Sequence, residues 1–263
     1  PICQRFAWRD AERNAVQDVD RSGRARQCQA QIFDLNRGSV RVGSDGRNLR
    51  VSKKEILAAV CGALAIPAAL LVPAHAAAPI RILGLGDSLM QGYGLPPGQD
   101  FPTRLQAKLV ADGANVQIIN GGVSGDTSSG GLSRIDWSLA DRPSAVLLEL
   151  GSNDALRGIA PEQTEKNIDT MLAKLKAAKV PVLLVGMMAP RNLGPGYVAK
   201  FDAIYPKLAR KYGVPLYPFF LDGVATQPEL NQRDGMHPNE KGVAIIVARI
   251  APYVKKLLAQ VKS

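Results

Sequence analysis

From residue 79 onward, short apolar runs alternate with amphipathic stretches along the chain. The apolar runs are rich in Val, Ile and Leu and predict five strands, at 80–85, 116–119, 145–150, 182–185 and 214–217. Continuous apolar runs of this length are typical of strands buried on both faces of a parallel sheet. Helical spacing predicts helices at 102–112, 129–139, 161–178 and 197–212, and a last one capped by Asn239 and reaching about residue 260. The alternation predicts an α/β fold, a doubly wound sandwich with its ligand site at the carboxyl ends of the strands.

The first 77 residues follow a different pattern. Residues 1–50 are arginine-rich and have no sustained apolar period, so we expect no packed core there. Lys53 and Lys54 then precede a nearly uncharged run over 56–72, which is followed by Pro73-Ala74-His75-Ala76. A short basic region, an apolar stretch and an Ala-x-Ala site predict a secretory signal peptide over 51–77, cleaved near Ala76 and Ala77. The run is short and alanine-rich for a spanning helix, so we do not favour a membrane anchor through an uncleaved signal.

Export signals begin chains, yet no methionine occurs before Met90. We therefore expect translation to begin at Val51, since a valine codon can initiate in bacteria. Residues 1–50 are then a non-native or disordered extension, and 78–263 form the functional domain. Export would place this domain in the periplasm or outside the cell.

Charge and cysteine content narrow the function of that domain. Residues 1–78 hold 12 of the 33 basic and 7 of the 23 acidic residues, so the net charge falls from +10 for the chain to about +5 for the remainder. A mildly basic surface with dispersed lysines does not indicate nucleic-acid binding. All three cysteines lie before residue 78, which excludes a cysteine nucleophile from the domain. With one histidine it cannot build an ordinary zinc site, and we expect no metal or other cofactor.

Four polar motifs lie at the predicted edges of strands and helices. They are Gly86-Asp87-Ser88-Leu89, Asn120-Gly121-Gly122-Val123-Ser124-Gly125-Asp126-Thr127, Gly151-Ser152-Asn153-Asp154 and Asp234-Gly235-Met236-His237-Pro238. The first three directly follow predicted strands, and the fourth precedes the last helix. Because the carboxyl ends of parallel strands meet at one edge of a sheet, these motifs are expected to lie close together.

Acyl transfer by a serine hydrolase accounts for the residue types in these motifs. Ser88 needs a base to take its proton, and His237 is the only histidine outside the predicted signal peptide. Asp234 is close enough in a tight turn to meet His237 Nδ1 and fix the tautomer. The Asn153 side-chain amide and the backbone N–H groups of Gly125 and Ser88 are candidate donors to a tetrahedral oxyanion. We expect Asp87, Asp126 and Asp154 to brace loops.

Together the motifs resemble the SGNH (GDSL-type) hydrolases, named for a serine, a glycine, an asparagine and a histidine in four blocks. Residues 86–93, 124–132, 149–158 and 204–220 are similar to the bacterial periplasmic lysophospholipase, thioesterase and arylesterase branch, and the resemblance runs from Ile80 to about Val254. It implies a three-layer α/β/α sandwich around a five-stranded parallel sheet, of the flavodoxin-like type. It also implies Ser88 as nucleophile, Gly125 and Asn153 in the oxyanion hole, and Asp234 and His237 completing the triad.

We predict a serine esterase that hydrolyses aryl or alkyl esters, or a lipid ester, through an acyl-serine. Leu156, Met187, Met188 and Asn192 are candidates for the wall of its substrate cleft, although core packing explains the two methionines equally well. Acyl-chain preference does not follow from the resemblance, because the loop 191–196 lies where the family varies. Tyr93, Trp137 and Phe219 are expected in the core or at the rim.

Several alternatives remain open. Within the hydrolases they are a lysophospholipase, an acyl-CoA thioesterase and a carbohydrate deacetylase; from another class, a catalytically silent lipid- or glycan-binding module. An ordinary α/β-hydrolase is disfavoured because the chain lacks a Gly-x-Ser-x-Gly elbow. Nucleotide binding is disfavoured because Gly-x-Gly-x-x-Gly spacing and a Walker lysine are missing.

Overall fold

The computed structural model describes residues 78–261. The predicted extension over 1–50 and the signal peptide over 51–77 lie outside these residues. Among the described residues, no helix is both long and apolar enough to cross a membrane.

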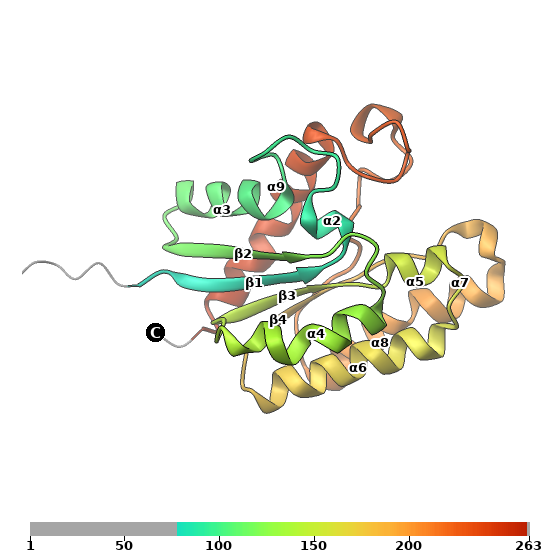
Figure 1. The fold of residues 1–263 in the computed structure, drawn as a ribbon, viewed down its shortest axis with the longest axis horizontal. Coiled ribbons are helices and arrows are strands. Elements are labelled where there is room, and N and C mark those ends of the chain that lie inside the picture. Colours follow the sequence, from blue (N-terminus) through green and yellow to red (C-terminus); the bar gives the residue numbers. More distant parts are fainter. Residues whose placement is uncertain (1–77, 262–263) are drawn as a thin grey trace, which may run out of the picture. The chain divides into compact units, whose positions relative to one another are not determined.

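Five parallel strands form one sheet, as predicted (Figure 1). The strands are β1 (Ile80–Gly86), β2 (Val116–Gly122), β3 (Ala145–Glu149), β4 (Val182–Val185) and β5 (Leu216–Tyr217). Their order is β2-β1-β3-β4-β5. The chain therefore moves outward from β1 to β2 and returns to the other side of β1 at β3. Loops diverge at such a reversal, which opens a crevice at the carboxyl ends of β1 and β3.

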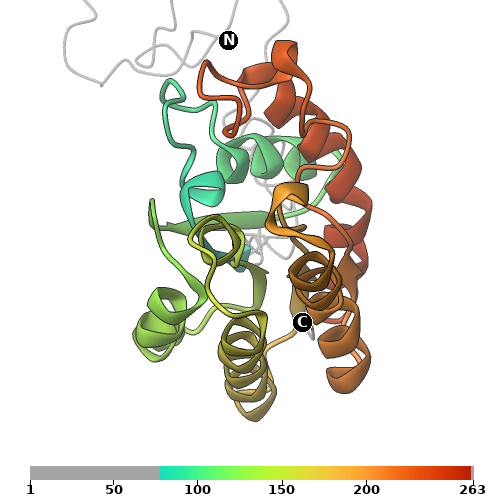
Figure 2. The same ribbon diagram turned by 90° about the vertical axis from the view of Figure 1, so that its right-hand side faces the viewer.

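Helices cover both faces of the sheet, which gives the three-layer sandwich (Figures 1 and 2). One face carries α3 (Phe101–Ala111) and α9 (Glu240–Leu258), and the other carries α4 (Ser128–Ala140), α6 (Pro161–Ala177) and α8 (Ile204–Tyr212). Every residue of β3 and β4 is buried because both of their faces are covered. The expected two-sided burial was wrong for β2, where only Val116 is buried. This strand pairs with β1 alone and lies at the edge of the sheet.

The last helix shows how capping and periodicity act together. The Asn239 side chain accepts hydrogen bonds from the backbone N–H groups of Lys241 and Gly242, at 2.9 and 3.1 Å, and so begins α9. Val243 and Ile246 begin its apolar face, which is fully covered by α3 and the sheet. The helix is thereby fixed directly after the motif that contains His237.

The helix predicted over 197–212 is in fact two helices, α7 (Pro195–Asp202) and α8, which meet at Ala203. Pro206 has no N–H to donate to the carbonyl of Asp202, so the helical hydrogen bonding is interrupted there. Two short helices were not predicted, α2 (Ser88–Gln91) and α5 (Ser152–Leu156). They are too short for an apolar period to identify, yet each begins within a motif that carries candidate chemistry.

Candidate active site

Ser88 is the first residue of α2 and lies just beyond the end of β1. The Asp87 side chain caps this helix by accepting a hydrogen bond from the Leu89 N–H at 2.9 Å. A Cβ atom on Gly86 would lie 2.4 Å from Glu149 Oε2, so only glycine fits between the end of β1 and this buried glutamate. The glycine thus lets the end of β1 pack closely against Glu149, and Ser88 follows at the carboxyl edge of the sheet.

The three candidate triad residues lie in one hydrogen-bonded row. His237 Nε2 is 2.9 Å from Ser88 Oγ, although the two residues are 149 positions apart in the sequence. His237 Nδ1 is 2.7 Å from Asp234 Oδ2. Asp234 Oδ1 accepts hydrogen bonds from the backbone N–H groups of Met236 and His237, at 2.9 and 3.0 Å. The tight turn therefore holds the carboxylate and the imidazole together.

Asp234 is ionised over the whole range in which an imidazole titrates. Partial burial raises the pKa of its carboxyl group, but the backbone N–H groups of His237 and Met236 and the imidazole outweigh this effect. The net result is a pKa lowered to about 2. An ionised Asp234 favours the tautomer of His237 in which Nδ1 carries the proton and Nε2 can accept a hydrogen bond from Ser88 Oγ.

Two of the three candidate oxyanion donors, Gly125 and Asn153, come from segments that are joined by hydrogen bonds. Asn153 is the second residue of α5, and its Nδ2 donates to the Asp126 carbonyl at 2.9 Å and to Asp87 Oδ2 at 3.2 Å. Arg157 Nη2 donates to the carbonyl of Gly125 at 2.8 Å. The segment containing Gly125 is therefore bound to α5 at two consecutive carbonyls. Ser88, Gly125 and Asn153 all border one cleft.

Two buried carboxyl groups, those of Asp87 and Glu149, lie directly before Ser88 and at the end of β3. Asp87 is fully buried and accepts a hydrogen bond from Ser152 Oγ. Its backbone N–H donates to Glu149 Oε2 at 3.3 Å. Burial raises the pKa of the Asp87 carboxyl, and burial together with the adjacent Asp87 raises the pKa of Glu149 well above its usual value. Sequence reasoning missed Glu149, which stands within an apolar strand and has no periodic signal of its own.

Asp126 and Asp154 brace loops, as the sequence indicated. Asp126 Oδ2 pairs with Arg134 Nε at 2.7 Å. Asp154 is fully buried and accepts hydrogen bonds from the Ser128 N–H at 2.7 Å and the Thr164 hydroxyl at 3.0 Å. These carboxylates tie the loops after β2 and β3 to α4 and α6.

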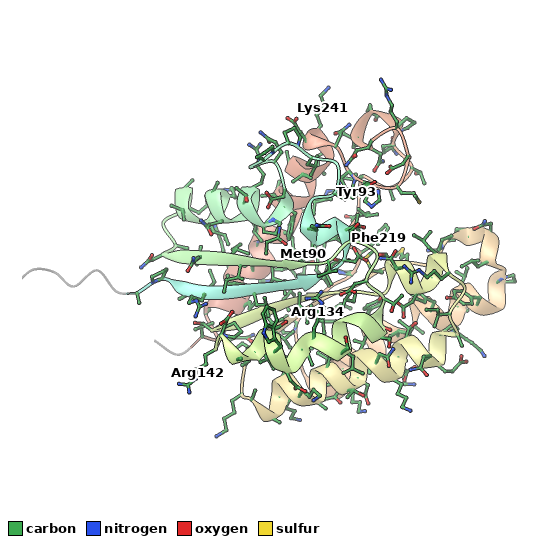
Figure 3. All side chains as sticks on the ribbon, in the orientation of Figure 1. Met90, Tyr93, Arg134, Arg142, Phe219 and Lys241 are labelled. Carbon is green, nitrogen blue, oxygen red and sulfur yellow. The ribbon has the colours of Figure 1, made fainter. Side chains whose placement is uncertain are left out.

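The cleft beside Ser88 and His237 has a volume of about 760 Å³, within the range of small-molecule sites. Its apolar wall consists mainly of Leu156, Met187, Met188, Phe219, Leu221 and Met236. Phe219 lies near the carboxyl ends of the strands (Figure 3). Three of the four predicted cleft residues thus line it, with Met187 buried and Leu156 and Met188 exposed at the mouth.

Asn192 is the predicted cleft residue that the structure places elsewhere. It lies in the 3₁₀ turn η1 (Arg191–Leu193) and is exposed, whereas Arg191 borders the cleft. Consecutive side chains of a 3₁₀ helix point about 120° apart, so a turn that directs Arg191 to the cleft directs Asn192 away from it. Within residues 78–261 no group of His, Cys, Asp and Glu side chains is arranged to hold a metal ion.

Comparison with known proteins places this geometry in a family. The sequence model of the GDSL-like Lipase/Acylhydrolase family matches residues 85–245. The chain belongs to this family. It is therefore a carboxylic ester hydrolase with the SGNH fold, which confirms the family, the fold and the enzyme class that the motifs predicted.

Individual members of the GDSL-like family are similar over nearly their whole length. The thioesterase 1/protease 1/lysophospholipase L1 of Escherichia coli is 40% identical over 185 residues, which cover 70% of this chain and 88% of that protein. The arylesterase of Vibrio mimicus is 39% identical over 179 residues, or 68% of this chain and 90% of that protein. The crystal structure of AlinE4, an SGNH-hydrolase family esterase, is 45% identical with a TM-score of 0.58, and covers 68% of this chain and 97% of its own.

Proposed function

We propose that this GDSL-family member is a serine esterase in which Ser88 is the nucleophile, His237 the general base and Asp234 the residue that orients it. The observation that carries the proposal is the continuous row from Ser88 Oγ to His237 Nε2 at 2.9 Å and from His237 Nδ1 to Asp234 Oδ2 at 2.7 Å. This row opens onto the cleft. A structural hydrogen-bond network needs no such access to a substrate-sized space.

In the proposed reaction, Ser88 Oγ forms a bond to the carbonyl carbon of the ester while its proton passes to His237 Nε2. The carbonyl π electrons move onto oxygen and give a tetrahedral oxyanion. Its collapse breaks the bond to the leaving alcohol, which takes the proton from the imidazolium, and an acyl-serine remains. Water then gives a proton to His237, attacks the acyl carbon and releases the acid, while Ser88 recovers its proton.

We assign oxyanion stabilisation to the backbone N–H groups of Ser88 and Gly125 and the side-chain amide of Asn153. The assignment is supported by their common position at the cleft and by the hydrogen bonds that hold the Gly125 segment against α5. Backbone donors fixed in advance stabilise the developing negative charge without a cost of reorganisation, whereas Asn153 Nδ2 exchanges one of its present acceptors, the Asp126 carbonyl or Asp87 Oδ2, for the oxyanion.

The proposed substrates are small aryl or alkyl esters. The cleft wall is mainly apolar, so it suits an aryl group or an acyl chain better than a sugar, whose hydroxyl groups need hydrogen-bond partners. The same wall favours a second candidate function, hydrolysis of long acyl chains as a lysophospholipase or acyl-CoA thioesterase. Each methylene group buried in the cleft contributes about 0.8 kcal/mol to binding.

A substrate panel tests the proposal. Purified protein is assayed with 4-nitrophenyl esters of increasing chain length, with palmitoyl-CoA and with lysophosphatidylcholine, in parallel with the Ser88→Ala variant. We expect hydrolysis of the aryl esters by the unaltered protein alone. Equal turnover by the variant excludes the proposed nucleophile, and absence of turnover on all three substrate types excludes the esterase.

We further infer that the enzyme acts outside the cytoplasm. The support lies in the sequence over 53–76, with its lysine pair, apolar run and Ala-x-Ala site.

A further inference from the structure

An aromatic ring packs directly against the proposed base. The ring centroids of Tyr93 and His237 are 4.8 Å apart, with an angle of 42° between the ring planes. Half of the Tyr93 surface is exposed, at 52%, whereas the side chain of His237 is only 17% exposed. The tyrosine ring therefore lies tilted against the imidazole, between solvent-exposed surface and the less exposed histidine. Figure 3 shows Tyr93 above the carboxyl ends of the strands.

The nucleophile and Tyr93 are held by the same short helix. Ser88 begins α2, and its carbonyl accepts hydrogen bonds from the N–H groups of both Gly92 and Tyr93 at 3.1 Å. Gly92 ends the helix with φ of 86°, a left-handed conformation that turns the chain back toward the histidine. The distance between the nucleophile and the ring is thus fixed over six residues of chain.

Gln232 connects this helix to the segment that carries the histidine. Its Nε2 donates to the Tyr93 carbonyl at 2.7 Å and to the Pro238 carbonyl at 3.0 Å. Its backbone N–H donates to the carbonyl of His237 at 2.7 Å. One glutamine therefore joins the backbone of Tyr93 to the backbone of His237 and of Pro238.

We propose that Tyr93 is a positioning residue for His237, whose ring limits rotation of the imidazole and favours the imidazolium that forms when Ser88 loses its proton. The proposal rests on the proposed role of His237 as base. A cation is attracted to the negative face of an aromatic ring, so the contact strengthens as the imidazole takes up the proton. The ring thus stabilises the transition state more than the resting enzyme, which raises kcat.

Other groups face the imidazole and remain unchanged when Tyr93 is replaced. Asp234 comes from its own segment and Asp87 from the turn before α2; both interact electrostatically with His237. A small crevice beside His237 is lined by apolar residues, among them Phe101 of α3, Val243 of α9 and Phe220, which follows β5. On the cleft side, Arg191 is paired with Asp202 at 2.6 Å.

The test compares two side chains of similar coverage that differ in aromatic character, Tyr93→Phe and Tyr93→Leu. For Tyr93→Leu we expect kcat on 4-nitrophenyl butyrate to fall roughly three- to tenfold, with KM changed less than about twofold. The acidic limb of its pH–kcat/KM profile should move about half a pH unit lower, because the protonated imidazole has lost its aromatic partner. Tyr93→Phe should recover most of the turnover and the original limb.

Three outcomes overturn the proposal. Tyr93→Leu leaves both kcat and the acidic limb of the pH profile unchanged, or it lowers kcat without moving that limb. In the third, Tyr93→Phe is as impaired as Tyr93→Leu. Trp137→Leu, which removes an exposed aromatic ring on α4, is the matched control. Tyr93→Met serves as a second non-aromatic variant if thermal unfolding shows that Tyr93→Leu is not folded. His237→Ala separates the two proposals, because full activity in that variant defeats the proposed function itself.

Discussion

Glu149 binds the backbone of Asp87, the residue directly before Ser88. The backbone N–H of Asp87 donates to Glu149 Oε2 at 3.3 Å, and both side chains are fully buried. Glu149 Oε1 has no hydrogen-bond partner among the described residues. Two buried carboxyl groups that interact through their charges cannot both be ionised cheaply. We therefore expect Glu149 to be protonated in the folded enzyme at neutral pH, which leaves the negative charge on Asp87.

The Glu149→Gln variant should be more stable than the unaltered protein at neutral pH. Burial and Asp87 raise the pKa of Glu149 well above 4.5 in the folded protein. The folded state therefore has its full stability below pH 4.5. It loses stability as the pH rises, because Glu149 ionises in the unfolded chain before it does so in the folded protein. Glutamine has a similar shape but cannot ionise, so this loss disappears. Urea denaturation at pH 5 and pH 8 measures the effect: the gain should be larger at pH 8. A gain that is absent, or equal at the two pH values, contradicts the protonated state. Glu162→Gln, at an exposed site, is the control.

The Ser88→Ala variant should lose ester hydrolysis by a factor of roughly 10⁴ or more while it remains folded. The hydroxyl contributes to the hydrogen bond with His237, but the Cβ packing of the buried residue is retained. Initial rates on 4-nitrophenyl acetate and the thermal unfolding midpoint check both parts. If a tenth of the activity remains, Ser88 is not the nucleophile.

Activity should fall along an acidic limb as the pH drops, because a protonated His237 cannot accept the serine proton. Asp234 cannot cause this limb, since its pKa is lowered to about 2. Because that pKa is depressed, the stability that Asp234 contributes is present above its usual value of 3.8 and is lost only as the pH falls toward 2. When kcat/KM is measured between pH 9 and pH 4, it should thus decline toward the acidic end while the protein stays folded. A flat profile over this range is incompatible with an imidazole base.

Replacement of Leu156 by Ala should shift acyl-chain preference. Leu156 borders the cleft and is 55% exposed, so an acyl chain that extends along the cleft can cover it. We expect kcat/KM to rise with chain length in the unaltered enzyme and to stop rising at a shorter chain in the variant. Hydrolysis of the acetyl ester should be nearly unchanged. Changes within residues 191–196 should act in the same way. An equal loss on short and long esters means that these segments only stabilise the fold.

Export should remove everything before about residue 77. N-terminal sequencing of the protein recovered from the periplasm of an expressing bacterium measures the cleavage position. A recovered chain that still carries residues 1–50 disproves both the predicted signal peptide and the predicted start at Val51.

The sequence by itself determined the elements that depend on local physics. Buried strands such as β4 and the capped helix α9 follow from apolar runs and from side chains that satisfy a helix terminus, both of which act over a few residues. It also determined the candidates for the triad. With one histidine outside the predicted signal peptide, His237 was the only imidazole available, and the spacing of Asp234 suits a tight turn.

Tertiary structure alone decided which side chains lie against Ser88, His237 and Asp87. The order of the sheet brings Ser88 to His237 across 149 positions, and the same approach puts the ring of Tyr93 on the imidazole and Glu149 beneath Asp87. No local pattern marks Tyr93 or Glu149, because their roles arise from neighbours distant in sequence. The exposure of β2 likewise depends on its position at the edge of the sheet. The exposure of Asn192 depends on its place within a 3₁₀ turn. Periodicity reports which face of an element is buried, whereas the partner on that face is set by how the elements pack.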